Sequence, residues 1–530
     1  MTFEADTSRA SGFVRAGLVL SGTFLISRVL GYIRTVVLGT TFGAGPELDT
    51  FFAAFRLPDL IFQIVAAGAM GSALIPVLSG LLATGDRARA WRVVGTVVNL
   101  MLVVLAVLAV AAFVAAPVLV RLVTPGFDDQ AVAMTTDLTR VMLVAPVLLA
   151  LGSVATSTLN AEGRFTAAAM APIVYNLAII SGAVLLGPSL GITGLAVGVV
   201  VGAFGHLAIQ LPAVWRLGFR PRFGVDLGDA AARRVLILLG PRALGLGVSQ
   251  LTFVVMTALA SSLGEGSISA YSIAFAVLQI PLGLIGIPLG IVIFPTLSRD
   301  HALGATATFV HLVTRSLRLI GFVTLPIAAL GIALRTQVVA LLFGYGRFDG
   351  EDIDRTAATF GLFLIGLTAH SAIAILARTF YAQQDTRRPV AAAILAVIVN
   401  ISLGVILVGP MGLPGLALAI ALAAWIEAAV LLVMLGRRER AFDVRGLLAA
   451  LGLSLAAAAM AGAAAAGVVV ALGDAVSPGA TRPLLVAGMV SATAVGSGLY
   501  LMIARVLKMP ELEQLIGIAR ARIGGRMARG

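Results

Sequence analysis

Long apolar runs, separated by short breaks that contain polar residues, glycine or proline, follow one another along almost the whole chain. A helix needs about 20 apolar residues to cross the hydrocarbon core of a bilayer. Fourteen runs reach that length: 16–42, 50–82, 92–121, 133–160, 165–187, 190–215, 233–262, 267–297, 311–342, 356–383, 388–409, 412–436, 445–472 and 482–507. The pattern predicts an all-α polytopic membrane protein with about fourteen transmembrane helices.

Two of the predicted spans carry several prolines. The span 50–82 contains Pro58 and Pro76, and the span 267–297 contains three prolines. Proline removes one helical N–H donor and clashes with the preceding turn. We therefore expect these two helices to be kinked or broken, at places where neighbouring helices or cavity water satisfy the freed carbonyl groups.

Segments of the chain repeat at an interval of about 220 residues. Three pairs match in register: 69–79 with 288–298, 164–176 with 388–400, and 194–196 with 415–417. The repeat predicts two pseudo-symmetric six-helix lobes, residues 1–216 and 217–436, followed by two more helices and a basic tail in 437–530. Chance similarity between small apolar segments is the alternative. Two such lobes can rock against each other around a central site, which gives alternating access.

Composition supports a membrane protein and excludes several other classes. The chain is 59% hydrophobic and 12% charged, and it has no cysteine. Disulfide frameworks and thiolate metal sites are therefore excluded. The net charge of +12 lacks the basic patches interleaved with aromatic residues that nucleic-acid binding needs. We expect no nucleic acid, no metal, no cofactor and no enzymatic activity.

The positions of the cations predict the orientation. Most arginines and lysines fall in the two termini and in alternate loops. Five fall on the opposite side: Arg121, Arg335, Arg347, Arg355 and Arg482. Cytoplasmic loops carry the excess of cations. We predict a multi-pass protein of the bacterial cytoplasmic (inner) membrane with both termini in the cytoplasm.

Three arginines lie inside the first two predicted spans, at Arg28, Arg34 and Arg56. A cation in hydrocarbon costs at least about 2.5 kcal/mol, so such residues usually face a bundle interior or a water-filled cavity. Arginine binds phosphate and carboxylate groups through two parallel hydrogen bonds. The hypothesis is a cationic chamber for an anionic group. The alternative is a set of internal salt bridges with Asp49 and Asp59.

The repeat predicts that the cations of this chamber are concentrated in the first lobe. At the matching positions the second lobe has uncharged residues, Ser249, Val255 and Phe275. The second lobe is expected to pack without cations at these positions, so packing alone does not require them. The asymmetry therefore indicates that the binding site lies at the arginines of the first lobe. Arg242, which follows a Gly-Pro pair, is a candidate to complete the chamber from the second lobe. Snorkelling of its side chain to the interface is the alternative.

Glu427 and His206 occupy matching positions of the two repeats. A carboxylate in the middle of a span can carry a coupling proton or cation, so both residues are candidates for coupling. The alternative is a hydrogen-bonded packing role for each.

The chain resembles the MurJ (MviN) family of lipid II flippases, within the multidrug/oligosaccharidyl-lipid/polysaccharide exporter superfamily. The resemblance lies in Ser27-Arg-Val-Leu-Gly-Tyr-Ile-Arg34, Phe42-Gly-Ala-Gly45 with Asp49, Phe55-Arg-Leu-Pro58, Gly68-Ala69, Ile75-Pro76, Thr124-Pro-Gly-Phe127, Asn160, Arg164-Phe165, Gln210-Leu-Pro212, Gly240-Pro241, Ser249-Gln250, Tyr345-Gly-Arg-Phe348, Phe380-Tyr381, Gln384-Asp385 and Pro389.

This resemblance implies fourteen helices, a cationic cavity between two lobes, and a hydrophobic groove lined by the last two helices. It implies export of undecaprenyl-diphosphate-linked peptidoglycan precursor to the outer leaflet. Together with the cations inside the spans, this leads us to predict substrate contacts by Arg28, Arg34, Arg56, Asp49 and Arg242. The implied partners are this lipid, membrane lipids, and proteins of cell-wall synthesis and division.

The chain also departs from the family pattern. Asp often follows the second arginine of the first helix, where this chain has Thr35. An Arg and a Glu are often found where it has Phe62 and Ala67, and an Asp-Arg pair where it has Phe275 and Ala276. Two alternatives therefore stay open. One is an exporter of another polyprenyl-linked glycan or a drug, and the other is a transport-inactive paralogue that scaffolds cell-wall synthesis.

Overall fold

The computed structural model describes residues 3–65, 69–220 and 224–517. Its contacts group the chain into two compact units. Unit 1 comprises Met1–Ser269 with the short segment Gly346–Phe348, and unit 2 comprises Ala270–Tyr345 with Asp349–Gly530. The described residues contain helices and loops, and no strand.

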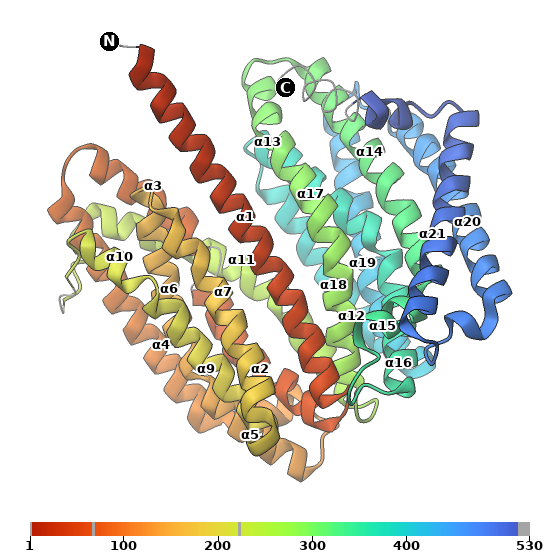
Figure 1. Cartoon of the computed structure of the whole chain (residues 1–530). Coiled ribbons are helices and arrows are strands. Elements are labelled where there is room, and N and C mark those ends of the chain that lie inside the picture. The colour runs from red at the N-terminus through yellow and green to blue at the C-terminus, as the bar shows by residue number, and fades with distance from the viewer. Residues whose placement is uncertain (1–2, 66–68, 221–223, 518–530) are drawn as a thin grey trace. The chain divides into compact units, whose positions relative to one another are not determined.

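Unit 1 contains eleven α-helices and one π-helix in its described part. They are α1 (Phe3–Phe42), α2 (Pro46–Val65), α3 (Ala69–Ala83), α4 (Arg87–Val123), α5 (Asp129–Met142), α6 (Val144–Ala161), α7 (Phe165–Ser181), η1 (Gly182–Leu186), α8 (Gly187–Leu190), α9 (Ile192–Ala208), α10 (Leu211–Arg216) and α11 (Ala230–Ser261). Figure 1 shows α4, α6, α7 and α9 side by side. The core between α3, α4 and α6 is built from buried side chains such as Leu74, Val97 and Leu159.

Unit 2 continues from α12, whose first three residues group with unit 1. Its elements are α12 (Ser267–Pro281), η2 (Leu282–Gly286), α13 (Ile287–Ala302), α14 (Thr306–Ala333), α15 (Arg335–Phe343), α16 (Gly350–Ile365), α17 (Leu367–Ala382), α18 (Arg387–Met411), α19 (Leu413–Arg438), α20 (Val444–Leu472), η3 (Gly473–Val476) and α21 (Arg482–Val506). The last two long helices, α20 and α21, pack against each other and against α14. Small residues permit this close approach: a Cβ on Gly462 would lie 3.0 Å from the carbonyl oxygen of Ala329.

Eleven described helices, or twelve if the bent pair α16 and α17 counts as one span, are long and apolar enough to cross a membrane. They cover twelve of the fourteen predicted spans. The other two, 50–82 and 233–262, are the spans where the described residues or their side chains are interrupted. The predicted all-α polytopic membrane fold is confirmed, and the total of fourteen stays a prediction.

The repeat is visible in backbone geometry within each unit. Gly191 precedes α9 with φ 56° and ψ −141°, and Gly412 precedes α19 with φ 59° and ψ −139°. These angles favour glycine, because L side chains rarely adopt them. Asp128 and Asp349 cap α5 and α16 in the same extended conformation. Each pair is 221 residues apart, which agrees with the interval of the repeat in the sequence.

The division by contacts differs from the division by repeat. Helix α11, which the repeat assigns to the second lobe, packs against α2, α3 and α4 in unit 1. The boundaries 1–216, 217–436 and 437–530 therefore describe the repeat and stay a prediction. Prolines act as expected in one span: the π-helix η2 follows directly after Pro281.

Unit 1 also includes the loop residues Gly346–Phe348. The backbone N–H of Arg347 donates to the carbonyl oxygen of Thr40 at 2.9 Å. The Arg347 side chain pairs with Glu47 at 3.2 Å, and Phe348 is buried. This loop is thus held at the end of α1 by one backbone bond, one ion pair and one buried ring.

Candidate substrate-binding site

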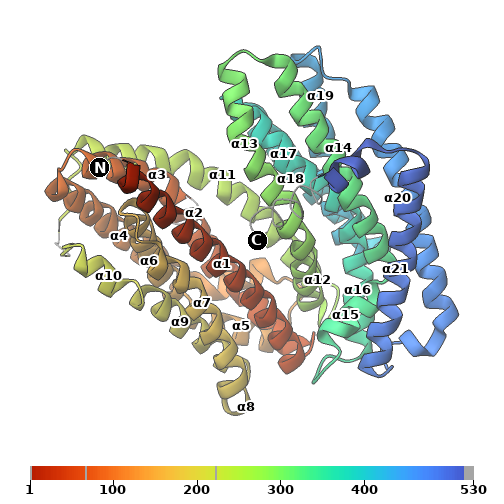
Figure 2. The ribbon, with the colours of Figure 1, turned by 45° about the horizontal axis from the view of Figure 1, so that its top comes forward.

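Helix α1 carries Arg28 and Arg34, and both side chains are partly buried. Figures 1 and 2 show α1 lying along α7, against which it packs. Gly31, between the two arginines, faces α7: a Cβ there would lie 4.0 Å from Oδ1 of Asn176. This face of α1 therefore lies against α7, and Arg34 comes within electrostatic range of Tyr175.

Helix α2 adds Arg56, whose side chain contacts α11. Its Nε donates to the hydroxyl of Thr257 at 2.9 Å. Its guanidinium lies 5.6 Å from the centre of the Phe253 ring, a cation–π arrangement. The contacts fix the arginine in place, and Thr257 in turn donates to the carbonyl oxygen of Phe253.

Asp59 lies one turn after Arg56 and interacts electrostatically with it. Two amides also donate to its carboxylate: Gln63 at 3.4 Å and Gln250 at 3.1 Å. Tyr175 lies within electrostatic range of both Asp59 and Arg34. Arg34, Tyr175, Asp59 and Arg56 are thus linked in sequence, each within electrostatic range of the next. We call these four residues, which come from α1, α2 and α7 and are supported by α11, the arginine cluster.

Asp49 has a different environment from the one the sequence indicated. Its side chain is 2% exposed. The carboxylate accepts the backbone N–H groups of Gly266 at 2.7 Å and Ser269 at 2.6 Å, and it also accepts the Ser269 hydroxyl. Asp49 therefore satisfies the N–H groups at the start of α12 in the way an N-cap residue does. It lies ten residues, about 15 Å along the helix, from Asp59.

The remaining candidates are placed as follows. The backbone of Arg242 is in α11, but its side chain lies outside the described part of the structure. His206 in α9 packs closely against Gly152, because a Cβ added to Gly152 would overlap Nδ1 of the His206 ring. That Nδ1 is buried and has no hydrogen-bond partner among the described residues. Glu427 in α19 is partly buried and interacts electrostatically with Tyr381 of α17.

The arginine cluster is specific to unit 1. In unit 2, the position that matches Arg56 is Phe275, and its ring packs edge-on against Phe363 at 5.5 Å. An apolar aromatic contact thus occupies the place of the guanidinium. Among the described residues, no group of three or more His, Cys, Asp or Glu side chains could hold a metal ion.

Sequence reasoning did not single out Tyr175 or Thr257 for the site. The signal for Tyr175 was a polar pair, Tyr175-Asn176, inside an otherwise apolar span. Thr257 gave no such signal, because a lone threonine in a membrane helix usually bonds its own backbone. Its second bond, to Arg56, needs the packing of α2 on α11.

Unit 2 contains an apolar cavity of about 690 Å³. Residues of α14 and α20, such as Ala329 and Gly462, line it together with Trp425 of α19. One cation, Arg335, lies at its edge. No residue of α21 lines this cavity, so the hydrophobic groove expected between the last two helices stays a prediction.

Comparison with known proteins gives consistent results. A family model described as "Lipid II flippase MurJ" matches residues 38–486. The lipid II flippase MurJ of Burkholderia cenocepacia is 32% identical over 434 residues, which are 80% of this chain and 84% of the relative. The probable lipid II flippase MurJ of Vibrio cholerae is 31% identical over 81% of this chain and 83% of its own.

Solved structures show the same fold. A lipid II flippase MurJ in an inward closed conformation superposes with a TM-score of 0.77 at 21% identity, covering 92% of this chain and 98% of that one. An inward-facing multidrug resistance MATE transporter superposes with a TM-score of 0.64 at 17% identity, covering 80% and 98%. At these sequence identities, the superpositions support a similar fold and nothing more.

Proposed function

Because the chain belongs to the lipid II flippase MurJ family, we propose that it moves lipid II across the bacterial cytoplasmic membrane by alternating access. The substrate is a peptidoglycan precursor linked to a polyprenyl diphosphate. The movement runs from the cytoplasmic to the outer leaflet and changes no covalent bond. Both termini then lie in the cytoplasm, as the distribution of cations predicts.

The observation that carries this proposal is the arginine cluster. Arg34 and Arg56 are held on different helices; Arg56 interacts electrostatically with Asp59, and Arg34 lies within electrostatic range of Tyr175, which is also in range of Asp59. A diphosphate offers several oxygens in a small volume, and arginine forks match this geometry. Without substrate, Asp59 balances the charge of Arg56. When a diphosphate enters, its oxygens take over that role.

Arg28 extends the cluster along α1. It lies six residues before Arg34, about 9 Å along a helix. That spacing suits a second contact to the headgroup rather than to the same phosphate. Arg242 is a further proposed contact, from α11. We leave Asp49 out of the proposed site, because its carboxylate is engaged at the start of α12.

The charge of the cluster also favours this function over the alternatives. A cationic drug would be repelled by a cluster with two partly buried arginines and one carboxylate. A scaffold without transport would not need cations inside a membrane bundle, where they are costly. An inside-negative potential favours outward movement of an anionic headgroup, by about 2.3 kcal/mol per charge per 100 mV.

The test is depletion of the protein in its own host, followed by measurement of lipid II on the outer leaflet with a membrane-impermeant probe. We expect exposed lipid II to fall while the total pool rises. Purified protein in liposomes should move a fluorescent lipid II analogue, and Arg34→Ala with Arg56→Ala should abolish that movement. A matched control, Arg437→Ala with Arg440→Ala, removes two exposed arginines of unit 2. Unchanged exposure of lipid II during depletion would refute the proposed function.

A further inference from the structure

Two polar residues of α11, Gln250 and Thr257, contact the charged residues of α2. Thr257 bonds to Arg56, and Gln250 bonds to Asp59. The two polar residues are seven positions apart, about two helical turns, so they lie on one face of α11. Thr257 is buried and Gln250 is partly buried. The proposed contact with the diphosphate uses the charges of α2 and assigns no role to this pair.

The Thr257 hydroxyl fixes the plane of the Arg56 guanidinium. It donates to the carbonyl oxygen of Phe253 at 2.8 Å, so its oxygen remains as an acceptor. The Nε of Arg56 donates to that oxygen at 2.9 Å, and the guanidinium lies 5.6 Å from the centre of the Phe253 ring. Two residues of α11, one turn apart, therefore hold the guanidinium at its Nε edge and beside a ring.

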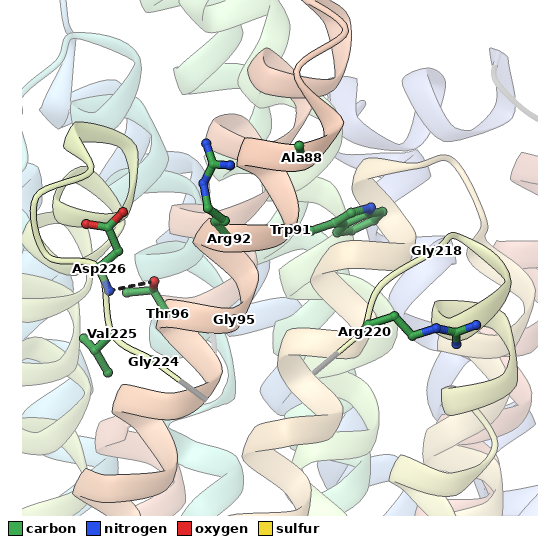
Figure 3. A pocket seen from close by; sticks show the side chains of 10 residues that line it. All are labelled: Ala88, Trp91, Arg92, Gly95, Thr96, Gly218, Arg220, Gly224, Val225 and Asp226. Atoms are coloured by element: carbon green, nitrogen blue, oxygen red, sulfur yellow. Dashed lines mark hydrogen bonds between the residues drawn. The ribbon is translucent and has the colours of Figure 1, made fainter. Parts of the chain in front are cut away.

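Other buried threonines of unit 1 use their hydroxyls differently. Thr136 and Thr158 donate to carbonyl oxygens of their own helices. Thr96 of α4 accepts the backbone N–H of Asp226 at 3.2 Å, the bond drawn in Figure 3, and so holds a loop. Thr257 differs from these three because it accepts from a charged side chain of another helix.

The Gln250 amide acts on the carboxylate next to Arg56. Oδ2 of Asp59 accepts from Gln250 at 3.1 Å, and Oδ1 accepts from Gln63 at 3.4 Å. Each carboxylate oxygen therefore has an amide donor, while Arg56 interacts with the carboxylate electrostatically. The amides thus compete with the guanidinium for the carboxylate oxygens.

The repeat indicates that helix packing alone does not require this polar pair. At an interval of 221 residues, α1 has Val29 and Val36 where α11 has Gln250 and Thr257. A polar side chain inside an apolar environment costs free energy unless it is hydrogen-bonded. The bonds that satisfy this pair lead to the two charged residues of α2, so the pair accompanies the charges of unit 1.

We propose that Thr257 and Gln250 are positioning residues that prepare Arg56 for the diphosphate of the transported lipid. Thr257 orients the guanidinium, and Gln250 keeps the Asp59 carboxylate from pairing with it. Ordering one rotamer-rich side chain costs up to about tenfold in affinity. Thr257 removes that cost before the substrate binds. The inference rests on the proposed function, because the diphosphate is the ligand.

The test measures binding of a fluorescent lipid II analogue to the purified full-length protein in detergent, and movement of the analogue in liposomes. Thr257→Val removes the hydroxyl and keeps the shape of the side chain. We expect it to weaken binding about tenfold and to raise the half-saturating concentration for movement equally. The maximal rate should stay unchanged, whereas a folding defect would lower it. Thr257→Ser keeps the hydroxyl and should bind like the wild type.

Thr96→Val is the matched control, since it removes a buried hydroxyl of the same unit that holds a loop. It should keep the wild-type affinity. An equal loss of affinity in Thr96→Val or in Thr257→Ser would overturn the proposal, because the loss would then come from packing and not from the bond to Arg56.

Two further variants keep the test independent of any misfolding of Thr257→Val. Gln250→Met removes the amide with Thr257 intact and should also weaken binding. In the Arg56→Ala background, Thr257→Val should add less than about a twofold loss, because its effect passes through the guanidinium; an added tenfold loss would overturn the proposal. Wild-type affinity in both Thr257→Val and Gln250→Met would overturn this inference alone. Failure of the wild type to bind and move the analogue would overturn the proposed function, and this inference with it.

Discussion

The structure gives Asp49 a role in holding the start of α12, whereas the sequence predicted a substrate contact. The variant Asp49→Ala tests which role is correct. The wild-type carboxylate accepts two backbone N–H groups in a buried place, those of Gly266 and Ser269. The alanine variant leaves both donors without an acceptor. An unsatisfied buried donor costs about 1–3 kcal/mol. We therefore expect the free energy of unfolding to fall by about 4 kcal/mol.

The assay is thermal unfolding of the detergent-solubilised protein. At about 2 °C per kcal/mol for a domain of about 250 residues, the melting temperature should fall by about 8 °C. Asp49→Asn should fall less, because its amide oxygen still accepts one N–H group. Glu351→Ala is the control, since Glu351 is exposed and pairs with its helix neighbour Arg355. It should stay within about 0.5 kcal/mol of the wild type.

Transport measured below the melting temperature completes the test. If Asp49 only supports the fold, the folded Asp49→Asn protein should retain transport. A variant with the wild-type melting temperature but no transport would refute the reasoning. Asp49 would then be a substrate contact, as the family resemblance implied.

Three further predictions follow from named contacts. Gly346 has φ 59°, and a Cβ there would overlap the carbonyl oxygen of Thr40, so Gly346→Ala should lower the melting temperature. Gly350→Ala is the control and should not lower it, because a Cβ at Gly350 meets nothing within 4 Å. Arg89 donates to Asp229 and lowers the pKa of that carboxyl below its ordinary 3.8. The stabilisation is therefore present above about pH 4 and is lost as pH falls through the lowered pKa. Asp229→Asn should be less stable than wild type at pH 7, and the difference should shrink as the pH is lowered below about 4. Arg34→Lys should retain only part of the lipid II movement that Arg34→Ala abolishes, because a point charge cannot form two parallel hydrogen bonds to a phosphate; full activity would argue for a diffuse field.

The apolar pattern was sufficient to predict the helices, because a membrane helix needs a continuous apolar run of known length. It was insufficient to predict partners across helices. The bond between Arg56 and Thr257 joins residues 201 positions apart, and those between Asp49 and Ser269 span 220. Neither pair has a local signature. The charge of Asp49 was visible in the sequence, but its role depends on how close α2 comes to the start of α12.

Matched positions of the repeat explain why charge, rather than fold, distinguishes the two units. A Cβ on Gly71 would lie 3.9 Å from the hydroxyl of Ser157, and one on Gly290 would lie 2.8 Å from a guanidinium nitrogen of Arg378. These pairs are about 220 residues apart, so the same close contact between helices recurs with a different side chain. Backbone geometry at Gly191 and Gly412 is likewise the same. Since the packing contacts recur in both units, the packing does not require the arginines that unit 1 alone has at these positions. Arginines inside a membrane protein cost free energy. We therefore infer that a ligand of unit 1 offsets this cost.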